Sequence, residues 1–138
     1  MSCPFCNLDE TRTRTLEERK HCRIILSNPR LMLGHLLVIP KRHVEKPSQL
    51  DEEEKKELID TTIEFQERIL SKIARGCDIR QNYRPFTPDG RTKVSHLHFH
   101  LQPREFEDEL YHKRQKFDTS FFKDLTKEEI KETFRRLK

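Results

Sequence analysis

Long hydrophobic runs are absent from this chain of 138 residues. The longest uninterrupted apolar stretch, residues 36–39, is far shorter than the roughly 20 residues that a membrane-spanning helix needs. The N-terminus also lacks the basic start and apolar segment of a secretory signal. We therefore expect neither a membrane protein nor an exported one, and the cytoplasm is the expected compartment.

Apolar residues are scarce and charged residues are abundant, at 33% and 38% of the chain, against about 25% charged in an average domain. The length suits one core, so residues 1–138 are expected to form a single domain. The net charge of +4 suits an anionic ligand without requiring nucleic acid. The basic clusters at 113–116 and 135–138 lack interleaved aromatic residues, so a nucleic-acid partner is not expected.

Hydrophobic patterning predicts antiparallel strands and one long helix, which together indicate an α+β domain. Residues 7–20 are polar and are expected to meander over the surface. Strands are predicted at 23–27, 36–39, 78–83 and 94–102, with Pro103 ending the last, and the long helix at about 50–75. Residues 110–123 are expected to be partly helical, and Thr126 with Glu129 forms a capping box that predicts a short C-terminal helix.

Three histidines alternate along the predicted strand 94–102. Because strand side chains alternate between faces, His96, His98 and His100 are expected to share one face. A histidine-rich edge or a weak metal patch is one interpretation, but buried imidazoles are costly without partners. Chemistry at phosphorus explains the pattern better, because a central imidazole can attack while its neighbours polarise oxygens and protonate a leaving group.

These residues resemble a known family. Segment 96–102 is similar to the His-x-His-x-His-x-x motif of the histidine-triad (HIT) nucleotide hydrolases and transferases, with Gln102 as its one non-apolar departure. Segment 34–43, in which His35 precedes an apolar run and a proline, resembles the family's upstream strand. The resemblance covers a family core within 1–104 and leaves 105–138 as a C-terminal extension. It implies a HIT-like α+β fold with a meandering antiparallel sheet, usually in a homodimer.

The resemblance also implies roles for the histidines. His98 would attack the α-phosphorus of a nucleotide or dinucleoside polyphosphate and form a covalent nucleotidyl-histidine. His100 and His35 would contact the phosphate and the leaving group, and His96 would support the triad or bind metal. The third histidine favours a hydrolase, since nucleotidyl-transferring relatives carry glutamine there. A nucleotidyltransferase or phosphorylase, a non-catalytic zinc-containing nucleotide-binding module, and an enzyme with metal held by the triad remain alternatives.

The loop before the triad departs from the family pattern. Residues 91–93, Arg-Thr-Lys, stand where many members carry Gly-Gln-Ser to hold phosphate oxygens. Arginine and lysine also bind phosphate, although these charges could equally be solvated. The ribose-binding acid of many members has no clear counterpart near Ser27 and Asn28, and Asn28 is the candidate substitute. The candidate substrate-binding residues are Asn28, Asn82, Thr92, Lys93 and Gln102.

Cys3 and Cys6 have the spacing of half a zinc site, and zinc requires four ligands. Without an export signal, the cysteines are expected to be thiols or metal ligands rather than disulfides. A redox pair and an unanchored pair of thiols are the alternatives. The resemblance to the zinc-containing branch of the family implies that His43 and His96 complete a structural Zn²⁺ site.

Overall fold

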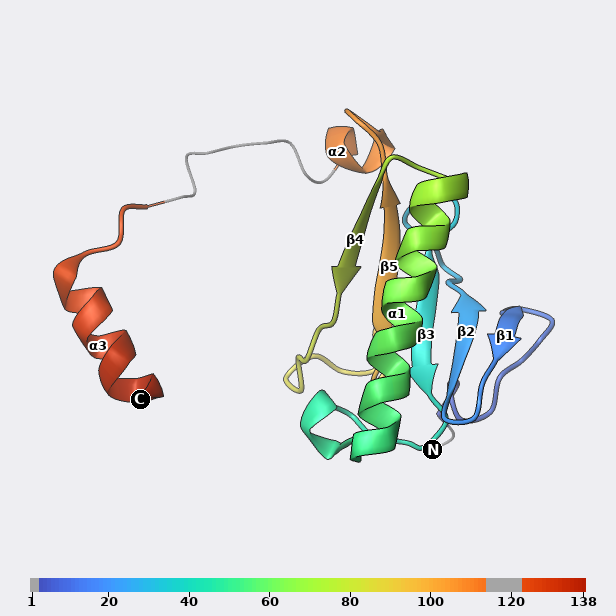
Figure 1. The fold of residues 1–138 in the computed structure, drawn as a ribbon, viewed down its shortest axis with the longest axis horizontal. Helices are drawn as coiled ribbons and strands as arrows, with labels where there is room; N and C mark the ends of the chain where they lie inside the picture. Colours follow the sequence, from blue (N-terminus) through green and yellow to red (C-terminus); the bar gives the residue numbers. More distant parts are fainter. Residues whose placement is uncertain (1–2, 114–122) are drawn as a thin grey trace.

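A computed structural model describes residues 3–113 and 123–138. One five-stranded antiparallel sheet, in the order β1-β2-β3-β5-β4, carries the long helix α1 across one face (Figure 1). The strands are β1 (Thr15–Glu18), β2 (Cys22–Leu26), β3 (Leu36–Pro40), β4 (Gly76–Arg80) and β5 (Phe99–Arg104). The helices are α1 (Glu52–Lys72), α2 (Glu109–Lys113) and α3 (Lys127–Leu137), with a 3₁₀ turn at Pro47–Gln49. The predicted α+β class is confirmed.

The sheet has a hydrophobic cluster on each face. Every residue of the central strand β3 is buried, as its continuous apolar sequence requires. On one face, Phe65 and Ile69 of α1 pack against the buried side chains of the inner strands. On the opposite face, Phe5 and Leu8 of the N-terminal segment pack against a smaller cluster from β2 and β3. The N-terminal segment therefore covers part of the face that α1 leaves open.

Helix α1 begins with a capping box. The Asp51 carboxylate accepts the backbone N–H of Glu54, and the Glu54 carboxylate accepts that of Asp51. Acidic residues fill the first turn, where they favour the positive end of the helix dipole. The predicted helix is confirmed, with ends at 52 and 72 rather than near 50 and 75.

Several sequence-based boundaries were wrong. The polar stretch 7–20 contains β1, which pairs with β2. The strand predicted at 78–83 is β4, which begins at Gly76 and ends at Arg80. The last strand begins at Phe99 rather than residue 94 and continues through Pro103 to Arg104. Proline fits there because β5 has passed its last pair with β3, at Leu101, and has only β4 as a neighbour.

The C-terminal part contains two short helices. Helix α2 falls within the region predicted to be partly helical, whereas residues 114–122 of that region lie outside the described residues. The Thr126–Glu129 capping box is confirmed: the Thr126 hydroxyl accepts the Glu129 N–H, and the Glu129 carboxylate accepts the Thr126 N–H. No residue of α3 is buried, and Figure 1 shows the helix away from the sheet. Among the described residues, no helix is long and apolar enough to cross a membrane.

Candidate active site and metal centre

Two cysteines and two histidines converge at the end of the sheet. A turn at the N-terminus brings Cys3 and Cys6 together, with the Cys6 N–H donating to the Cys3 carbonyl. The Nδ1 atom of His96 lies 3.4 Å from the Cys3 sulfur, 3.6 Å from the Cys6 sulfur and 3.1 Å from Nδ1 of His43. The Cys6 sulfur lies 3.3 Å from Nδ1 of His43. All four ligand atoms lie within 4.8 Å of one another.

This geometry fits a tetrahedral zinc ion. Zinc bonds of about 2.3 Å to sulfur and about 2.0–2.1 Å to nitrogen give tetrahedral edges of about 3.5 Å for S···N and about 3.3 Å for N···N. The three S···N distances and the N···N distance given above are within a few tenths of an ångström of those edges. The chemistry also fits, because the Nε2–H of His96 donates to the carbonyl of Pro40 at 2.8 Å and leaves Nδ1 free as a ligand. The cluster therefore suggests zinc.

Two contacts hold the histidines of this cluster in place. The Arg42 guanidinium makes two hydrogen bonds, of 3.0 and 2.7 Å, to the buried Glu54 carboxylate and ties the segment before His43 to the start of α1. This pairing lowers the pKa of Glu54 to about 2. The Leu97 N–H donates to the Val44 carbonyl at 2.6 Å. The Leu97 backbone is thus bonded to the loop after β3 and not to a neighbouring strand, which is why β5 begins later than its sequence predicted.

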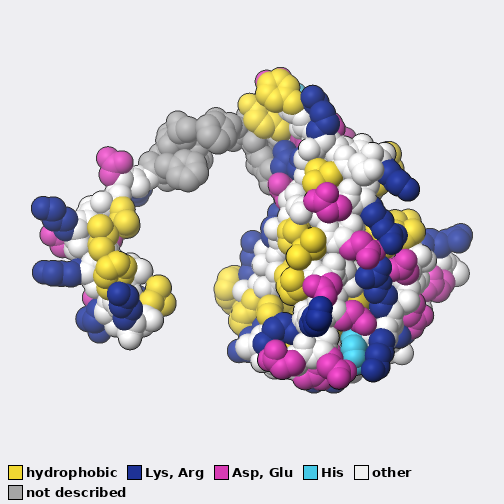
Figure 2. Space-filling model, in the orientation of Figure 1, with side chains coloured by type: hydrophobic (Ala, Val, Ile, Leu, Met, Phe, Trp, Pro, Cys, Tyr) yellow, Lys and Arg dark blue, Asp and Glu magenta, His cyan; other side chains and the backbone are white. Residues whose placement is uncertain are grey.

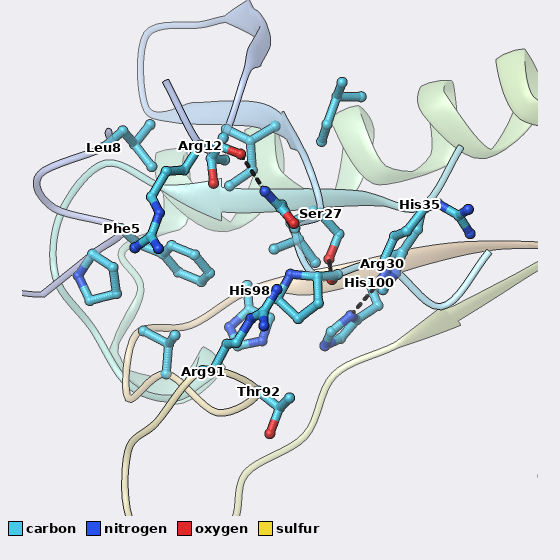
Figure 3. A pocket seen from close by; sticks show the side chains of 18 of the residues that line it. Phe5, Leu8, Arg12, Ser27, Arg30, His35, Arg91, Thr92, His98 and His100 are labelled. Atoms are coloured by element: carbon cyan, nitrogen blue, oxygen red, sulfur yellow. Dashed lines mark hydrogen bonds between the residues drawn. The ribbon is translucent and has the colours of Figure 1, made fainter. Parts of the chain in front are cut away.

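A cavity of about 700 Å³ opens on the face of the sheet opposite α1. Figure 3 shows it from close by, with His98 and His100 on its floor. His35, from the start of β3, also lines it, whereas His96 belongs to the metal cluster. His96 and His98 both precede β5, and His96 takes part in the Cys/His cluster in which it was expected, instead of lining the cavity.

The ring orientation of His98 is set by the backbone. Its Nδ1 lies 2.7 Å from the carbonyl oxygen of His96. A carbonyl only accepts, so Nδ1 carries the proton and Nε2 of the neutral ring keeps its lone pair. Burial lowers the pKa of His98 from its ordinary value, against the opposing effect of this hydrogen bond, which favours a neutral ring at pH 7. The Phe5 ring meets the His98 ring edge-on, with centroids 5.2 Å apart.

His35 and His100 form a directional pair. The Leu31 N–H donates to Nδ1 of His35 at 3.1 Å, so the His35 proton resides on Nε2. That Nε2–H donates to Nδ1 of His100 at 2.9 Å, which places the His100 proton on its own Nε2. Burial, with nearby Arg80, lowers the pKa to about 4 for His35 and about 3 for His100. Both rings are neutral at pH 7, and His100 presents an N–H donor.

The predicted substrate-binding residues divide into two groups. Asn28, Asn82 and Thr92 line the cavity. Lys93 lies outside its lining, where its ammonium contacts Asp89 and Ser95 at 3.0 and 2.7 Å. Gln102 also lies outside it and is buried farther along β5, with its amide N–H donating to the Pro103 carbonyl.

Arginines are the cavity residues that the sequence reasoning missed. Among the arginines, the sequence indicated only Arg91 as a possible phosphate-binding residue, because it lies just before the triad. The others come from the N-terminal segment, the loop after β2, and the end of β4 with the residues that follow it, and no local motif marks them. The arginines that line the cavity are Arg12, Arg30, Arg80, Arg84 and Arg91.

Comparisons with known proteins agree with this fold and these motifs. The model of the HIT domain family matches residues 9–107. An uncharacterized HIT-like protein of Methanocaldococcus jannaschii is 32% identical over 108 residues, which are 74% of this chain and 78% of that protein. Because the family model matches more than half of the chain, the protein belongs to the HIT family.

Solved structures extend the comparison. A HIT family member from Bacillus subtilis superimposes with a TM-score of 0.75 at 21% identity, over 99% of this chain and 95% of that one, and shows the same fold. A zinc-bound histidine triad family protein from Mycobacterium smegmatis gives a TM-score of 0.64 at 25% identity, over 98% and 91% of the two chains. The predicted family and HIT fold are thus confirmed, and the zinc-bound relative agrees with the Cys/His cluster.

Proposed function

We propose that this protein hydrolyses a phosphoanhydride or phosphoramidate bond at the α-phosphorus of a nucleotide, through a covalent nucleotidyl-His98 intermediate. The orientation of the His98 ring carries the proposal. Its Nδ1–H is held by the His96 carbonyl, so the remaining lone pair, on Nε2, belongs to a side chain that lines the cavity. Family membership supports the nucleotide as substrate, and the cavity volume of about 700 Å³ is of the size that small-molecule ligands occupy.

In the first step, Nε2 of His98 attacks the α-phosphorus, and the bond to the leaving group breaks with its electron pair. The His96 carbonyl stabilises the positive charge that develops on the ring, because it already accepts the Nδ1 proton. The Nε2–H of His100 donates to a phosphate oxygen or to the leaving group, and its orientation is fixed by His35. In the second step, water attacks the phosphorus and releases the nucleotide and free His98.

The metal centre has a structural role in this proposal. Cys3, Cys6, His43 and His96 would hold one Zn²⁺ in a closed shell, which leaves no position for substrate or water. Each His96 ring nitrogen is then engaged, one with the metal and one with the Pro40 carbonyl. The ligands therefore fix the N-terminal segment and the triad loop, and no reaction step passes through the metal.

A homodimer is part of the same proposal. Ile59, Ile63 and Leu70 are apolar residues of α1 that are 37–53% exposed. Figure 2 shows hydrophobic side chains along α1 in the view of Figure 1. Light scattering at micromolar concentration is expected to give twice the chain mass, and an Ile63→Lys variant is expected to shift it toward the monomer. A wild-type monomer would contradict the dimer and leave the chemistry unaffected.

Trapping the intermediate tests the function directly. Wild-type protein mixed with an α-³²P-labelled nucleotide substrate and quenched in alkali is expected to retain label on the protein, because phosphoramidates of histidine survive base. His98→Ala is expected to retain none, whereas His112→Ala, which changes an exposed histidine outside the cavity, is expected to behave as wild type. Release of the nucleotide product in a buffer that contains no added phosphate indicates a hydrolase, because a phosphorylase needs phosphate as the acceptor. Binding without turnover of any nucleotide would instead indicate a non-catalytic module.

A further inference from the structure

The cavity around the histidines carries an excess of positive charge. Five arginines line it, against a single acidic residue, Asp9. The Asp9 carboxylate already accepts the N–H and hydroxyl of Thr11, at 3.0 and 2.5 Å. None of the five arginines forms an ion pair with any residue that the structure describes. Arginine side chains collected in one cavity without acidic partners are typical of a site for an anion.

Three of the cavity arginines come from β4 and its connection to β5. Arg80 is the last residue of β4 and pairs in register with His100 of β5. Arg84 and Arg91 belong to the connection between these two strands. Arg80 acts on His100 and His35 electrostatically, since its charge contributes to their lowered pKa values. A charged guanidinium therefore stands beside the proposed donor to the leaving group.

A tight turn presents Arg91 at the cavity. The Gly90 N–H donates to the Lys93 carbonyl at 2.9 Å, which closes the turn with Arg91 and Thr92 at its tip. Asp89 is the nearest acid in sequence, but its carboxylate oxygen accepts from Lys93 and Ser95 at 3.0 and 2.6 Å. Asp89 thus stabilises the turn instead of neutralising Arg91. In Figure 3, Thr92 lies on one side of His98, and Phe5 and Arg12 lie on the other.

We propose that Arg80, Arg84 and Arg91 bind the phosphates of the leaving group, so that the protein selects substrates whose leaving group carries two or more phosphates. This inference rests on the proposed function. One phosphoryl group at the α position would leave most of this positive charge uncompensated, whereas a di- or polyphosphate matches it. A nucleoside phosphoramidate, whose leaving group is an amine, would gain nothing from the three guanidinium groups.

With such a substrate, His98 displaces a di- or polyphosphate from the α-phosphorus. Nε2 of His98 forms a bond to the α-phosphorus, and the bond from that phosphorus to the bridging oxygen breaks. The bridging oxygen keeps the electron pair and leaves as the end of a di- or polyphosphate, where the arginines stabilise its charge. The leaving chain is either bare or capped by a second nucleoside. Both share the chemistry that the arginines recognise.

The experiment compares one substrate whose leaving group is a highly charged polyphosphate with one whose leaving group carries no phosphate. One is a dinucleoside tetraphosphate, and the other is the p-nitrophenyl ester of the corresponding nucleoside 5′-monophosphate, each in an adenosine and a guanosine series. The measurement is the ratio of kcat/KM for the tetraphosphate to that for the ester. In an Arg84→Gln, Arg91→Gln double variant, this ratio is expected to fall by at least about tenfold, as for lost charge-assisted hydrogen bonds. Arg14→Gln, an exposed arginine outside the cavity, is the matched control and is expected to keep the wild-type ratio.

Inhibition gives a second readout that does not require the tetraphosphate to turn over. Inorganic tripolyphosphate is expected to inhibit wild-type ester hydrolysis competitively, with an inhibition constant at least about tenfold higher in the double variant. A nucleoside triphosphate in place of the tetraphosphate distinguishes a bare leaving chain from a capped one. An unchanged ratio together with an unchanged inhibition constant overturns the arginine site while the proposed function stands. If wild type hydrolyses neither substrate, the proposed function fails, and tripolyphosphate binding by calorimetry still tests the site.

Discussion

His96 and His98 are two residues apart, yet they belong to regions with opposite properties. His96 is 1% exposed, and its ring faces the three other side chains of the Cys/His cluster and a backbone carbonyl. The His98 ring has one nitrogen held by the backbone and lines an open cavity. The difference shows that the surroundings of the second ring nitrogen decide what an imidazole does. An imidazole ring with both nitrogens engaged holds the chain in place, whereas a ring with one unengaged nitrogen can react.

The largest effects are expected from removing each histidine in turn. His98→Ala should lower the rate by at least about a thousandfold, because it removes the proposed nucleophile, while the melting temperature stays near that of wild type. His96→Ala should instead release zinc and lower the melting temperature. Steady-state kinetics, elemental analysis and calorimetry measure all three quantities. Near wild-type turnover by His98→Ala would contradict the assignment of the nucleophile.

The next effect concerns the metal centre alone. A Cys3→Ser, Cys6→Ser double variant should contain less than stoichiometric zinc and melt about 5–10 °C lower, because the ligands also tie down the N-terminal segment. Part of the activity should remain, since His98 is unchanged. Cys77→Ser, which changes a thiol outside the cluster, is the control. Stoichiometric zinc in the double variant would show that these cysteines are not the ligands.

As the pH falls from 7, the cavity histidines should lower the free energy of unfolding before most carboxylates become protonated. The pKa of His35 falls to about 4 in the folded protein, so between pH 6.5 and 4 the unfolded state binds more protons. Stability is therefore complete above about pH 6.5 and declines as the pH falls, with a loss of about 2 kcal/mol at pH 5 from His35. Urea titrations at pH 7.5, 6 and 5 measure this slope.

Two comparisons isolate the cause of that decline. His35→Gln should make the slope shallower, because the buried titrating group is gone. The same titrations in the Cys3→Ser, Cys6→Ser background exclude acid release of zinc as the explanation. An equally steep decline with His35→Gln would assign it to other groups.

The smallest effect concerns Phe5, which links the Cys/His cluster around His96 to the cavity around His98. Phe5 lies between the two cysteines in sequence and meets the His98 ring edge-on in the cavity. Phe5→Ala should raise KM by about three- to tenfold with a smaller change in kcat, because an aromatic contact contributes about 0.5–1.5 kcal/mol. Leu8→Ala, at a nearby cavity-lining apolar position, gives the comparison for general loss of packing. Equal KM changes in both variants would argue against a specific role for the Phe5 ring.

Local signals in the sequence were sufficient for much of the fold. The continuous apolar run of β3, the periodic stripe of α1 and the capping box of α3 depend on contacts between neighbours, and each predicted element is present. The start of β5 was not predictable in this way. Alternation at 94–98 is the pattern of a strand, but the bond from Leu97 to Val44 holds that segment to a distant loop.

The sequence by itself determined the family, the α+β class and the identity of the residues able to form the metal and histidine clusters. Composition and periodicity carry the class, because they act within a few residues of the chain, whereas the family and the set of cluster residues rest on the resemblance of the motifs. Only the tertiary structure decided that the backbone carbonyl of His96 orients the His98 ring, and that Arg12, Arg30 and Arg80 share its cavity. Those outcomes depend on hydrogen bonds and charges between segments far apart in sequence, which meet only once the sheet has formed.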